Sequence, residues 1–241
     1  MTQQQIWLYS ATTHCGAVRN MNEDSLMFRS ADGVWAVADG MGGHDAGEVA
    51  SQMITTALNK IDVERPLPDL VDAVEDSLLD VHREIRHYSR THCEGRTMGS
   101  TVVVLLTRGD LGVCIWAGDS RLYRYRDGEL SQISQDHSQV NEMVARGLLS
   151  PEEAENHPAS NVITRAVGAT DILYLDVTVL ELRKGDIYIL CSDGLYGALS
   201  QDEMLSRLRK SSIHEYANEF ISDSLKNGAR DNVTVVAVQV T

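Results

Sequence analysis

The sequence predicts an α+β protein, because strand-like and helix-like segments come in blocks with no strict alternation. Four consecutive strand-like runs fill residues 101–134, with only short turns between them. No proline-rich or serine-rich linker divides the 241 residues. We therefore expect one domain over 1–241 with one sizeable core.

The first block combines short strands with two helices. Apolar runs indicate strands at residues 6–12, 25–29 and 34–38. Helices are expected from about Gly47 to Lys60 and from about Pro68 to Ser89.

The middle block is rich in strands. The runs TVVVLLT, LGVCIWA, RLYRYR and ELSQIS are separated by RGD, GDS and DG turns, so they predict an antiparallel meander. A helical pattern follows from Ser138 to Gly147. The stretch Ser150-Pro151-Glu152-Glu153 has the layout of a capping box with proline at the first helical position, which indicates a second, short helix.

The last block returns to mixed elements. Strands are expected near Tyr174–Leu180 and Asp186–Cys191, helices near Gln201–Leu208 and His214–Asn227, and a final strand at Asn232–Val240. We find neither an internal repeat nor a low-complexity segment.

Composition and charge exclude several classes of function. A formal net charge of −14 argues against a nucleic-acid partner, since the phosphate backbone favours clustered Lys and Arg. The N-terminus lacks a secretion signal, and no apolar run approaches the roughly 18 residues of a membrane helix, so we expect a soluble cytoplasmic protein. The four cysteines are far apart and are expected to be reduced.

Three aspartates suggest a metal site. Asp39, Asp193 and Asp231 each stand where an apolar run meets a glycine-bearing turn, in VWAVADGMGG, IYILCSDGL and NGARDNVTVVAV. A buried strand can hold a carboxylate rigidly at its end, and the glycine lets backbone approach closely. Carboxylates that converge from distant segments repel one another unless cations lie between them.

Other Asp-Gly pairs in the chain serve as controls. Asp32-Gly33 and Asp127-Gly128 lie between strand-like runs, as a hairpin turn requires, and we expect turn chemistry alone. Asp119 is ambiguous. Gly118-Asp119 suits a hairpin between LGVCIWA and RLYRYR, and Asp119 also suits a functional site.

Six strings, in order, carry a family resemblance. They are Arg19-Asn20-Met21-Asn22-Glu23-Asp24, Ala38-Asp39-Gly40-Met41-Gly42-Gly43, Met98-Gly99-Ser100-Thr101, Gly118-Asp119-Ser120-Arg121, Ser192-Asp193-Gly194 and Gly228-Ala229-Arg230-Asp231-Asn232-Val233-Thr234. With these motifs the chain resembles the metal-dependent PP2C-type serine/threonine protein phosphatases of the PPM family. The match covers nearly the whole length, and the compact chain is similar to the stand-alone bacterial branch.

The resemblance implies a four-layer αββα sandwich, in which two antiparallel sheets pack face to face and helices cover both outer sides. It also implies a ligand set for two metal ions. Asp39 would bridge the ions, the carbonyl of Gly40 would bind one, Asp193 and Asp231 would bind the other, and Glu23 would reach the second ion directly or through water. Asp119, with Asp193, would hold a weaker third ion.

The chemistry of these ligands agrees with the resemblance. Carboxylates, a carbonyl and water suit Mg²⁺ or Mn²⁺, and none of the eight histidines forms a spaced pair near the aspartates, which excludes zinc. Two ions about 3.5–4 Å apart would make a bridging hydroxide the nucleophile. Arg19 is the candidate to bind the phosphate, because its planar fork donates two parallel hydrogen bonds. Asp24 would orient Arg19 or a metal-bound water, and Asn232 would support the ligands from behind.

Two departures from the family concern proton transfer and the third ion. Many eukaryotic relatives have histidine after the Asp-Gly as general acid, where this chain has Met41, which cannot donate a proton. A metal-bound water on the third ion is favoured as its substitute, and His44 is the alternative. Some relatives have a further acidic ligand where this chain has Gly197, so we expect weak third-ion affinity. The segment at about 139–168 corresponds to the family's variable flap. It either selects substrates or is a solvated helical excursion.

Competing functions were also weighed. A cysteine-dependent phosphatase needs Arg six positions after Cys, and no cysteine of this chain meets that requirement. A nucleotide-binding function fails because no Gly-Lys-Ser/Thr loop follows a strand. The remaining alternative is a catalytically silent module that binds phosphoproteins. The favoured function is an Mn²⁺- or Mg²⁺-dependent protein-serine/threonine phosphatase, monomeric, with phosphorylated proteins as substrates and a serine/threonine kinase as its counterpart.

Overall fold

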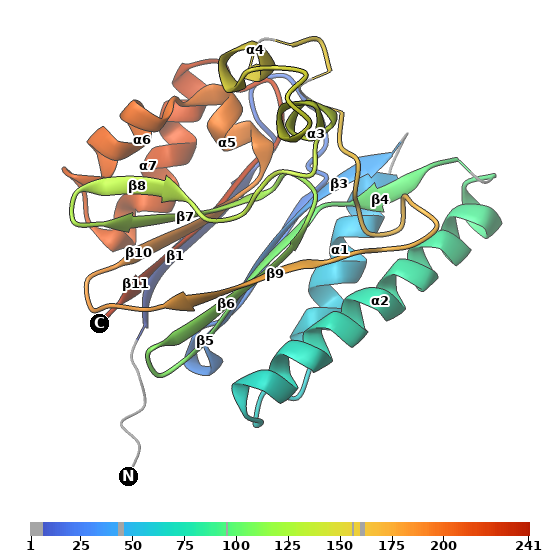
Figure 1. Ribbon diagram of the computed structural model, residues 1–241, viewed down its shortest axis with the longest axis horizontal. Helices are drawn as coiled ribbons and strands as arrows, with labels where there is room; N and C mark the ends of the chain where they lie inside the picture. The colour runs from blue at the N-terminus through green and yellow to red at the C-terminus, as the bar shows by residue number, and fades with distance from the viewer. Residues whose placement is uncertain (1–6, 43–45, 95, 156, 160–161) are drawn as a thin grey trace.

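Two β-sheets lie face to face, and helices cover the outer side of each sheet (Figure 1). This arrangement is seen in a computed structural model, which describes residues 7–42, 46–94, 96–155, 157–159 and 162–241. The fold is therefore α+β with four layers, αββα, as expected from the sequence.

The first sheet has strand order β2-β3-β5-β6-β9, with every neighbouring pair antiparallel. Its strands are β2 (Asp24–Arg29), β3 (Val34–Gly42), β5 (Val102–Arg108), β6 (Leu111–Ala117) and β9 (Asp176–Glu181), and a short β4 (Met98–Ser100) pairs with the end of β3. The second sheet has order β1-β11-β10-β7-β8. Its strands are β1 (Trp7–His14), β11 (Val233–Val240), β10 (Ile187–Cys191), β7 (Arg121–Arg126) and β8 (Glu129–Gln132).

Each sheet has its own helices. The first sheet is covered by α1 (Ala46–Asn59) and α2 (Leu67–His92), and the second by α5 (Asp193–Ala198), α6 (Gln201–Leu208) and α7 (Ile213–Lys226). Two short helices, α3 (Gln139–Ala145) and α4 (Pro151–Glu155), lie beyond one end of the sheets (Figure 1). A single 3-10 turn, η1 (Ser30–Asp32), joins β2 to β3.

The alternation of side chains along each strand divides the core into three layers. In β3, Val34 and Ala36 pack toward α1 and α2, whereas Trp35 and Val37 pack between the sheets. Trp35 is fully buried and meets Trp7 edge to face, with 5.2 Å between ring centroids. A one-residue slip in register would exchange these two layers, so the pattern fixes the pairing.

The predicted turns are largely confirmed. Asp127 and Gly128 form a two-residue hairpin loop between β7 and β8, and both have positive φ, 53° and 87°. The loop at Asp32-Gly33 is longer, because η1 precedes Gly33. The capping box at Ser150 is present: the Ser150 amide donates to Glu153 Oε2 at 2.8 Å, and the Glu153 amide donates to Ser150 Oγ at 3.2 Å.

The predicted meander is wrong at its centre. The strands β5 and β6 pair in one sheet, but β7 and β8 belong to the other sheet, so Gly118 and Asp119 form a crossing between sheets and not a hairpin. The strands β5 and β6 are buried on both faces, and such runs do not reveal which strand follows them in the same sheet.

Two expectations from composition can be compared with the structure. All four cysteines carry free thiols, and Cys114 and Cys191 are buried. Among the described residues, no helix is both long and apolar enough to cross a membrane.

Candidate metal centre

Asp24 and Asp39 face each other at one end of the first sheet. They are direct partners in the β2-β3 register, an arrangement that is unfavourable for two ionised carboxylates. Burial raises the pKa of Asp39 well above its usual range, and the nearby Asp24, Asp193 and Asp119 raise it further. A cation at this position would remove that repulsion.

Asp24 is tied to two other strand ends. Its Oδ2 accepts hydrogen bonds from Ser192 Oγ at 2.7 Å and from Thr234 Oγ1 at 2.6 Å, while its buried Oδ1 has no partner among the described residues. Burial raises the pKa of Asp24 to about 6 despite these two donors. Asp24 therefore joins β2 to the ends of β10 and β11. Asp24 makes no hydrogen bond with Arg19 in the described structure, so of its two expected roles the one toward a metal-bound water stays a prediction.

Asp193 is the first residue of α5, directly after β10. Burial, together with Asp119 and Asp231, raises its pKa to about 7. The next residue must be glycine, because a Cβ at Gly194 would collide with the backbone carbonyl of Asn232. This close approach holds the beginning of α5 against the segment that carries Asp231.

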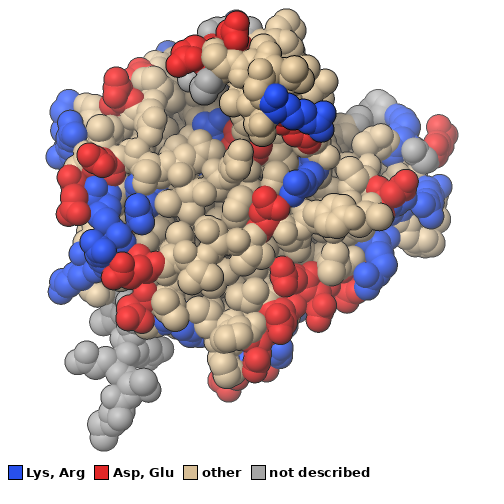
Figure 2. Space-filling view, viewed as in Figure 1, with Lys and Arg blue, Asp and Glu red and all other residues tan. Residues whose placement is uncertain are grey.

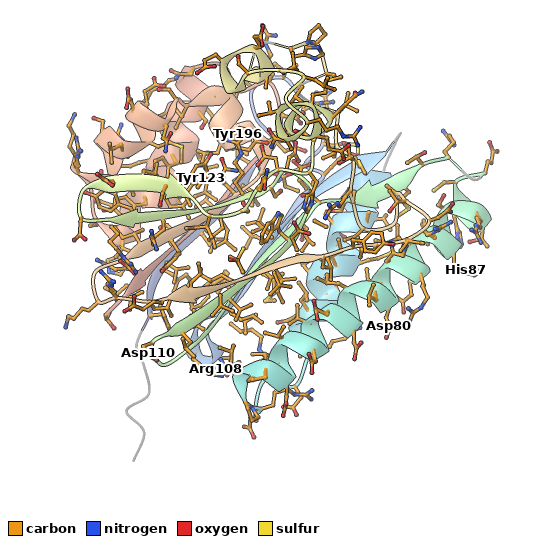
Figure 3. All side chains as sticks on the ribbon, in the orientation of Figure 1. Asp80, His87, Arg108, Asp110, Tyr123 and Tyr196 are labelled. Carbon is orange, nitrogen blue, oxygen red and sulfur yellow. The ribbon has the colours of Figure 1, made fainter. Side chains whose placement is uncertain are left out.

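Asp119 lies on the crossing from β6 to β7. It is 9% exposed, and burial and the nearby Asp136 raise its pKa to about 6. Its backbone carbonyl accepts a hydrogen bond from Tyr196 of α5 at 3.1 Å. The ring of Tyr196 lies under the guanidinium of Arg121, 3.5 Å from its centroid. Tyr196 therefore connects Asp119 to the helix that begins with Asp193, at the upper end of the sheets as drawn (Figure 3).

Arg19 and Asp231 form the exposed edge of the cluster. Arg19 donates to Asp231 Oδ2 at 2.7 Å, and their side chains are 54% and 40% exposed. The hydrogen bond and the charge of Asp231 raise the pKa of Arg19, which stays protonated. Only one of the guanidinium nitrogens is used in this contact.

Asn232 organises the loop that carries Arg19 and Glu23. Its side-chain oxygen accepts from the Glu23 amide at 2.8 Å, and its nitrogen donates to the carbonyls of Cys15 and Met21 at 3.0 and 2.8 Å. Asn232 thus ties this loop to the segment just before β11.

Glu23 and Gly40 pack against the first turn of α1. The Gly40 amide donates to the Glu23 carbonyl at 3.1 Å, and a side chain at Gly40 or Gly47 would collide with neighbouring backbone or with the Glu23 carboxylate. Glu23 Oε1 is buried without a hydrogen-bond partner among the described residues, and burial raises the pKa of Glu23.

These groups fit a hard divalent cation. The donors are all oxygens, two of the carboxylates have a buried oxygen without a partner, and the aspartates raise one another's pKa. Among the described residues, no three acidic, histidine or cysteine side chains are already close enough to hold an ion by themselves. Asp24 and Asp231 are instead held by hydroxyl and guanidinium groups. The fit rests on the donor set.

Several supporting residues were not predicted as functional. Thr101 accepts from the Asp39 amide at 3.1 Å and hydrogen-bonds Ser120 Oγ at 2.6 Å, and Ser192 and Thr234 bind Asp24. Ser120, Ser192 and Thr234 each lie within three residues of an aspartate in the motifs, and this adjacency of hydroxyl and carboxylate was the available signal. Thr101 has no aspartate near it in the sequence, so no such signal marked it. Asp136 binds Arg121 through both oxygens, and Ser138 caps α3. His44 lies outside the described residues.

Solved structures of bacterial phosphatases have the same fold. The structure of PppA from Pseudomonas aeruginosa has a TM-score of 0.90 and 37% identity, and covers 98% of each chain. The catalytic domain of PstP in complex with two manganese ions has a TM-score of 0.86 and 37% identity, again over 98% of each chain. The fold and the oxygen-donor site thus define the class of metal-dependent protein phosphatases.

Sequence comparison gives the family. The family model for protein phosphatase 2C matches residues 13–229, and the chain belongs to this family. The serine/threonine phosphatase stp of Listeria monocytogenes is 35% identical over 94% of this chain and 93% of its own length. The serine/threonine protein phosphatase PstP of Mycobacterium tuberculosis is 38% identical over 96% of this chain. This chain spans 45% of that PstP sequence. The resemblance drawn from the motifs is confirmed.

Proposed function

We propose that this chain hydrolyses phosphoserine and phosphothreonine in proteins, with two Mn²⁺ or Mg²⁺ ions held by Asp39, Gly40, Asp193, Asp231 and Glu23. The observation that carries the proposal is the convergence of aspartates from the ends of β3, β6 and β10 and from the segment before β11, in a member of this family. The ions, when bound, would activate water and withdraw charge from the phosphoryl group.

The protein's own residues would divide the remaining work. Asp39 would be shared between the ions, while Asp24 would hold the strand ends together behind it through Ser192 and Thr234. Arg19 would bind the phosphate with the guanidinium nitrogens that Asp231 leaves unused. Both groups are exposed enough to meet a phosphorylated side chain on a protein surface.

A weaker third ion would lie between Asp119 and Asp193. The contact from Tyr196 to Asp119 keeps these two carboxylates on facing elements, and no acidic side chain stands at Gly197 to add a ligand. Met41 pairs with Gly99 in β4 and offers no proton, so the proton for the leaving group would come from water in this region.

The segment 139–168 would act as a flap that contacts substrate, within one domain that spans 1–241. Its last residues are anchored beside the site, because Ser100 and Val167 exchange two backbone hydrogen bonds of 2.9 and 2.8 Å next to Thr101. We further propose that the chain acts as a monomer in the cytoplasm, on phosphoproteins of a serine/threonine kinase. The free thiols support that location.

The test is phosphate release from a phosphothreonine peptide with Mn²⁺, with EDTA, and with an Asp193→Asn variant. We expect hydrolysis that requires Mn²⁺ and falls at least about 100-fold in the variant, since one ligand carries several kcal/mol of charge stabilisation. Asp110→Asn is the matched control, because Asp110 lies at the opposite end of the sheets (Figure 3). Peptide binding without phosphate release would instead support the silent phosphoprotein-binding module.

A further inference from the structure

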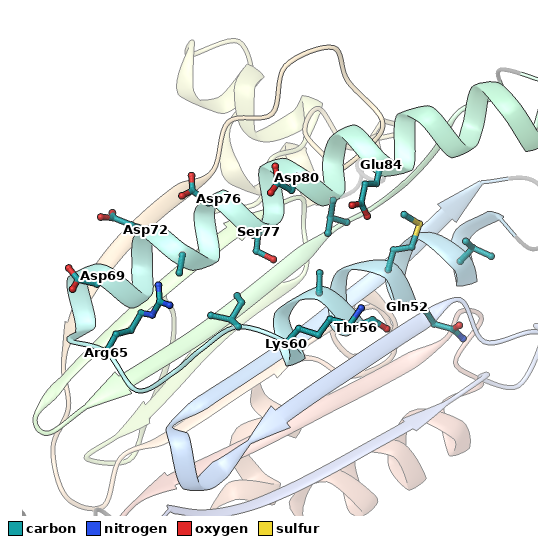
Figure 4. A pocket seen from close by; sticks show the side chains of 16 residues that line it. Gln52, Thr56, Lys60, Arg65, Asp69, Asp72, Asp76, Ser77, Asp80 and Glu84 are labelled. Carbon is teal, nitrogen blue, oxygen red and sulfur yellow. The ribbon is translucent and has the colours of Figure 1, made fainter.

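A groove runs between α1 and α2 on the outer face of the first sheet (Figure 4). Its volume is about 1110 Å³, and it is open to solvent. Half-buried apolar side chains from both helices, Met53, Ala57 and Ala73 among them, form its floor. The groove is thus wide and apolar at its base, and the proposed phosphatase site uses none of its lining residues.

One wall of the groove is a stripe of carboxylates on α2. We define the acidic stripe as Asp69, Asp72, Asp76, Asp80 and Glu84, which follow one another at intervals of three or four residues on one side of the helix (Figure 4). Figure 2 shows acidic side chains gathered along this part of the surface. Within the stripe, Asp80 alone has an ion pair among the described residues, with Arg83.

The opposite wall does not balance this charge. On α1 the wall is formed by Gln52 and Thr56. Of the two basic groups of the lining, Arg65 lies near Asp69 at one end of the groove and Lys60 lies nearer its middle (Figure 4). Arg65 is already paired with Asp62 at 3.2 Å. Among the described residues, most of the acidic stripe therefore has no ion-pair partner across the groove.

The acidic stripe lowers the stability of α2, the helix that carries it. Like charges four residues apart destabilise a helix by about 0.2–0.5 kcal/mol for each pair, and Asp72, Asp76, Asp80 and Glu84 form three such pairs in succession. The stability of α2 gives no reason for this arrangement. A ligand of opposite charge would supply one.

We propose that this groove binds a Lys- and Arg-rich amphipathic helix of a partner protein. The apolar face of such a helix would cover the floor, and its basic side chains would pair with the acidic stripe. From Asp69 to Glu84 the stripe rises about 22 Å along α2, which matches about four turns of an antiparallel or parallel helix beside it. A basic helix is favoured over an apolar or acidic one, because only a basic helix complements the negative charge of the acidic stripe.

The probe is a fluorescein-labelled peptide of 18 residues, with Leu on one helical face and Lys or Arg on the other. Its anisotropy is measured with the whole chain in Mn²⁺, at low and high salt. We expect binding that weakens with salt, and a loss of about tenfold in the triple variant Asp72→Asn, Asp76→Asn, Asp80→Asn. The matched control, Asp110→Asn, Glu129→Gln, Glu181→Gln, neutralises three exposed carboxylates elsewhere. It should bind within about twofold of the wild type.

Three results of the binding and sedimentation experiments would overturn the proposal. They are absence of binding to the wild type, an equal loss in both triple variants, and a dimer in sedimentation velocity that the groove substitutions abolish, which would make a second copy the occupant. The groove variant should melt at or above the wild-type temperature, because repulsion is removed. A fall of more than about 4 °C would assign the stripe a structural role and count against the proposal. The binding assay needs no hydrolysis, so its outcome is independent of the phosphatase test.

Discussion

Two glycines of one short helix have opposite environments. In α5, a Cβ at Gly194 would collide with the backbone carbonyl of Asn232, whereas a Cβ at Gly197 would meet nothing within 4 Å. Gly194 is therefore required by the packing that brings Asp193 and Asp231 together. At Gly197 no packing requires glycine, which forms helices less readily than alanine.

This contrast predicts opposite effects of one substitution. Gly194→Ala should lower the free energy of unfolding by about 1–3 kcal/mol, because neither backbone segment can move without shifting a carboxylate. Gly197→Ala should be neutral or stabilising by up to about 1 kcal/mol. Urea denaturation of both variants measures the difference. Equal effects at the two positions would refute the argument from close approach.

At the scale of elements, the crossing from β6 to β7 decides the role of Asp119. A hairpin would have left it in a solvated turn, but the crossing brings it over the junction of the two sheets, beside α5. Arg121, held by both oxygens of Asp136, lies over the ring of Tyr196, and the hydroxyl of Tyr196 reaches the carbonyl of Asp119. The crossing and the helix are thus coupled through one aromatic side chain.

Two variants separate the contributions of that side chain. Tyr196→Phe keeps the ring under Arg121 and removes the hydrogen bond to Asp119, which should cost about 1 kcal/mol of stability. Tyr196→Leu removes the stacking as well and should cost about 2–4 kcal/mol. Both variants should raise the Mn²⁺ concentration needed for half-maximal activity, measured by metal titration. The increase should be larger than in Tyr9→Phe, which changes a tyrosine of β1. A Phe variant with unchanged metal dependence would show that the hydroxyl does not position Asp119.

The success of sequence-based prediction follows from how local each signal is. The positions of Asp39, Asp193 and Asp231 in or beside β3, β10 and β11 were predicted, because an apolar strand and a glycine fix each position within a few residues, while their role as metal ligands stays a prediction. The pairing of β7 with β10 was not predicted, since it depends on contacts between residues about 65 apart. Likewise, the motifs could not reveal that Arg19 binds Asp231 or that the hydroxyls of Ser192 and Thr234 bind Asp24. These contacts depend on where four chain segments meet.

At the scale of the whole molecule, a chain of net charge −14 keeps several carboxylates buried in one place. The folded-state pKa of Asp193, about 7, lies above the ordinary value of about 3.9, so the folded protein binds a proton that the unfolded chain has released between these values. In the absence of metal, this residue therefore adds stability as pH falls through 7 and subtracts it as pH rises. Asp119 and Asp24 act in the same direction near pH 6. The buried His82 and His137, whose pKa values are lowered, act in the opposite direction.

The difference in melting temperature between the wild type and Asp193→Asn isolates the contribution of the Asp193 carboxylate, because His82 and His137 are the same in both proteins. In EDTA at pH 8, Asp193→Asn should melt at least about 3 °C above the wild type, since it removes a buried negative charge. Near pH 5.5 this difference should be smaller, because Asp193 is then protonated in the folded state, and it should vanish only below about pH 4, where the unfolded chain is protonated as well. Excess Mn²⁺ at pH 8 should reverse the order, because the wild type gains binding energy that the variant lacks. Thermal scans at the two pH values, with and without Mn²⁺, give all four comparisons. A variant less stable than the wild type in EDTA at pH 8 would mean that Asp193 is held by partners of its own and is not kept for a cation.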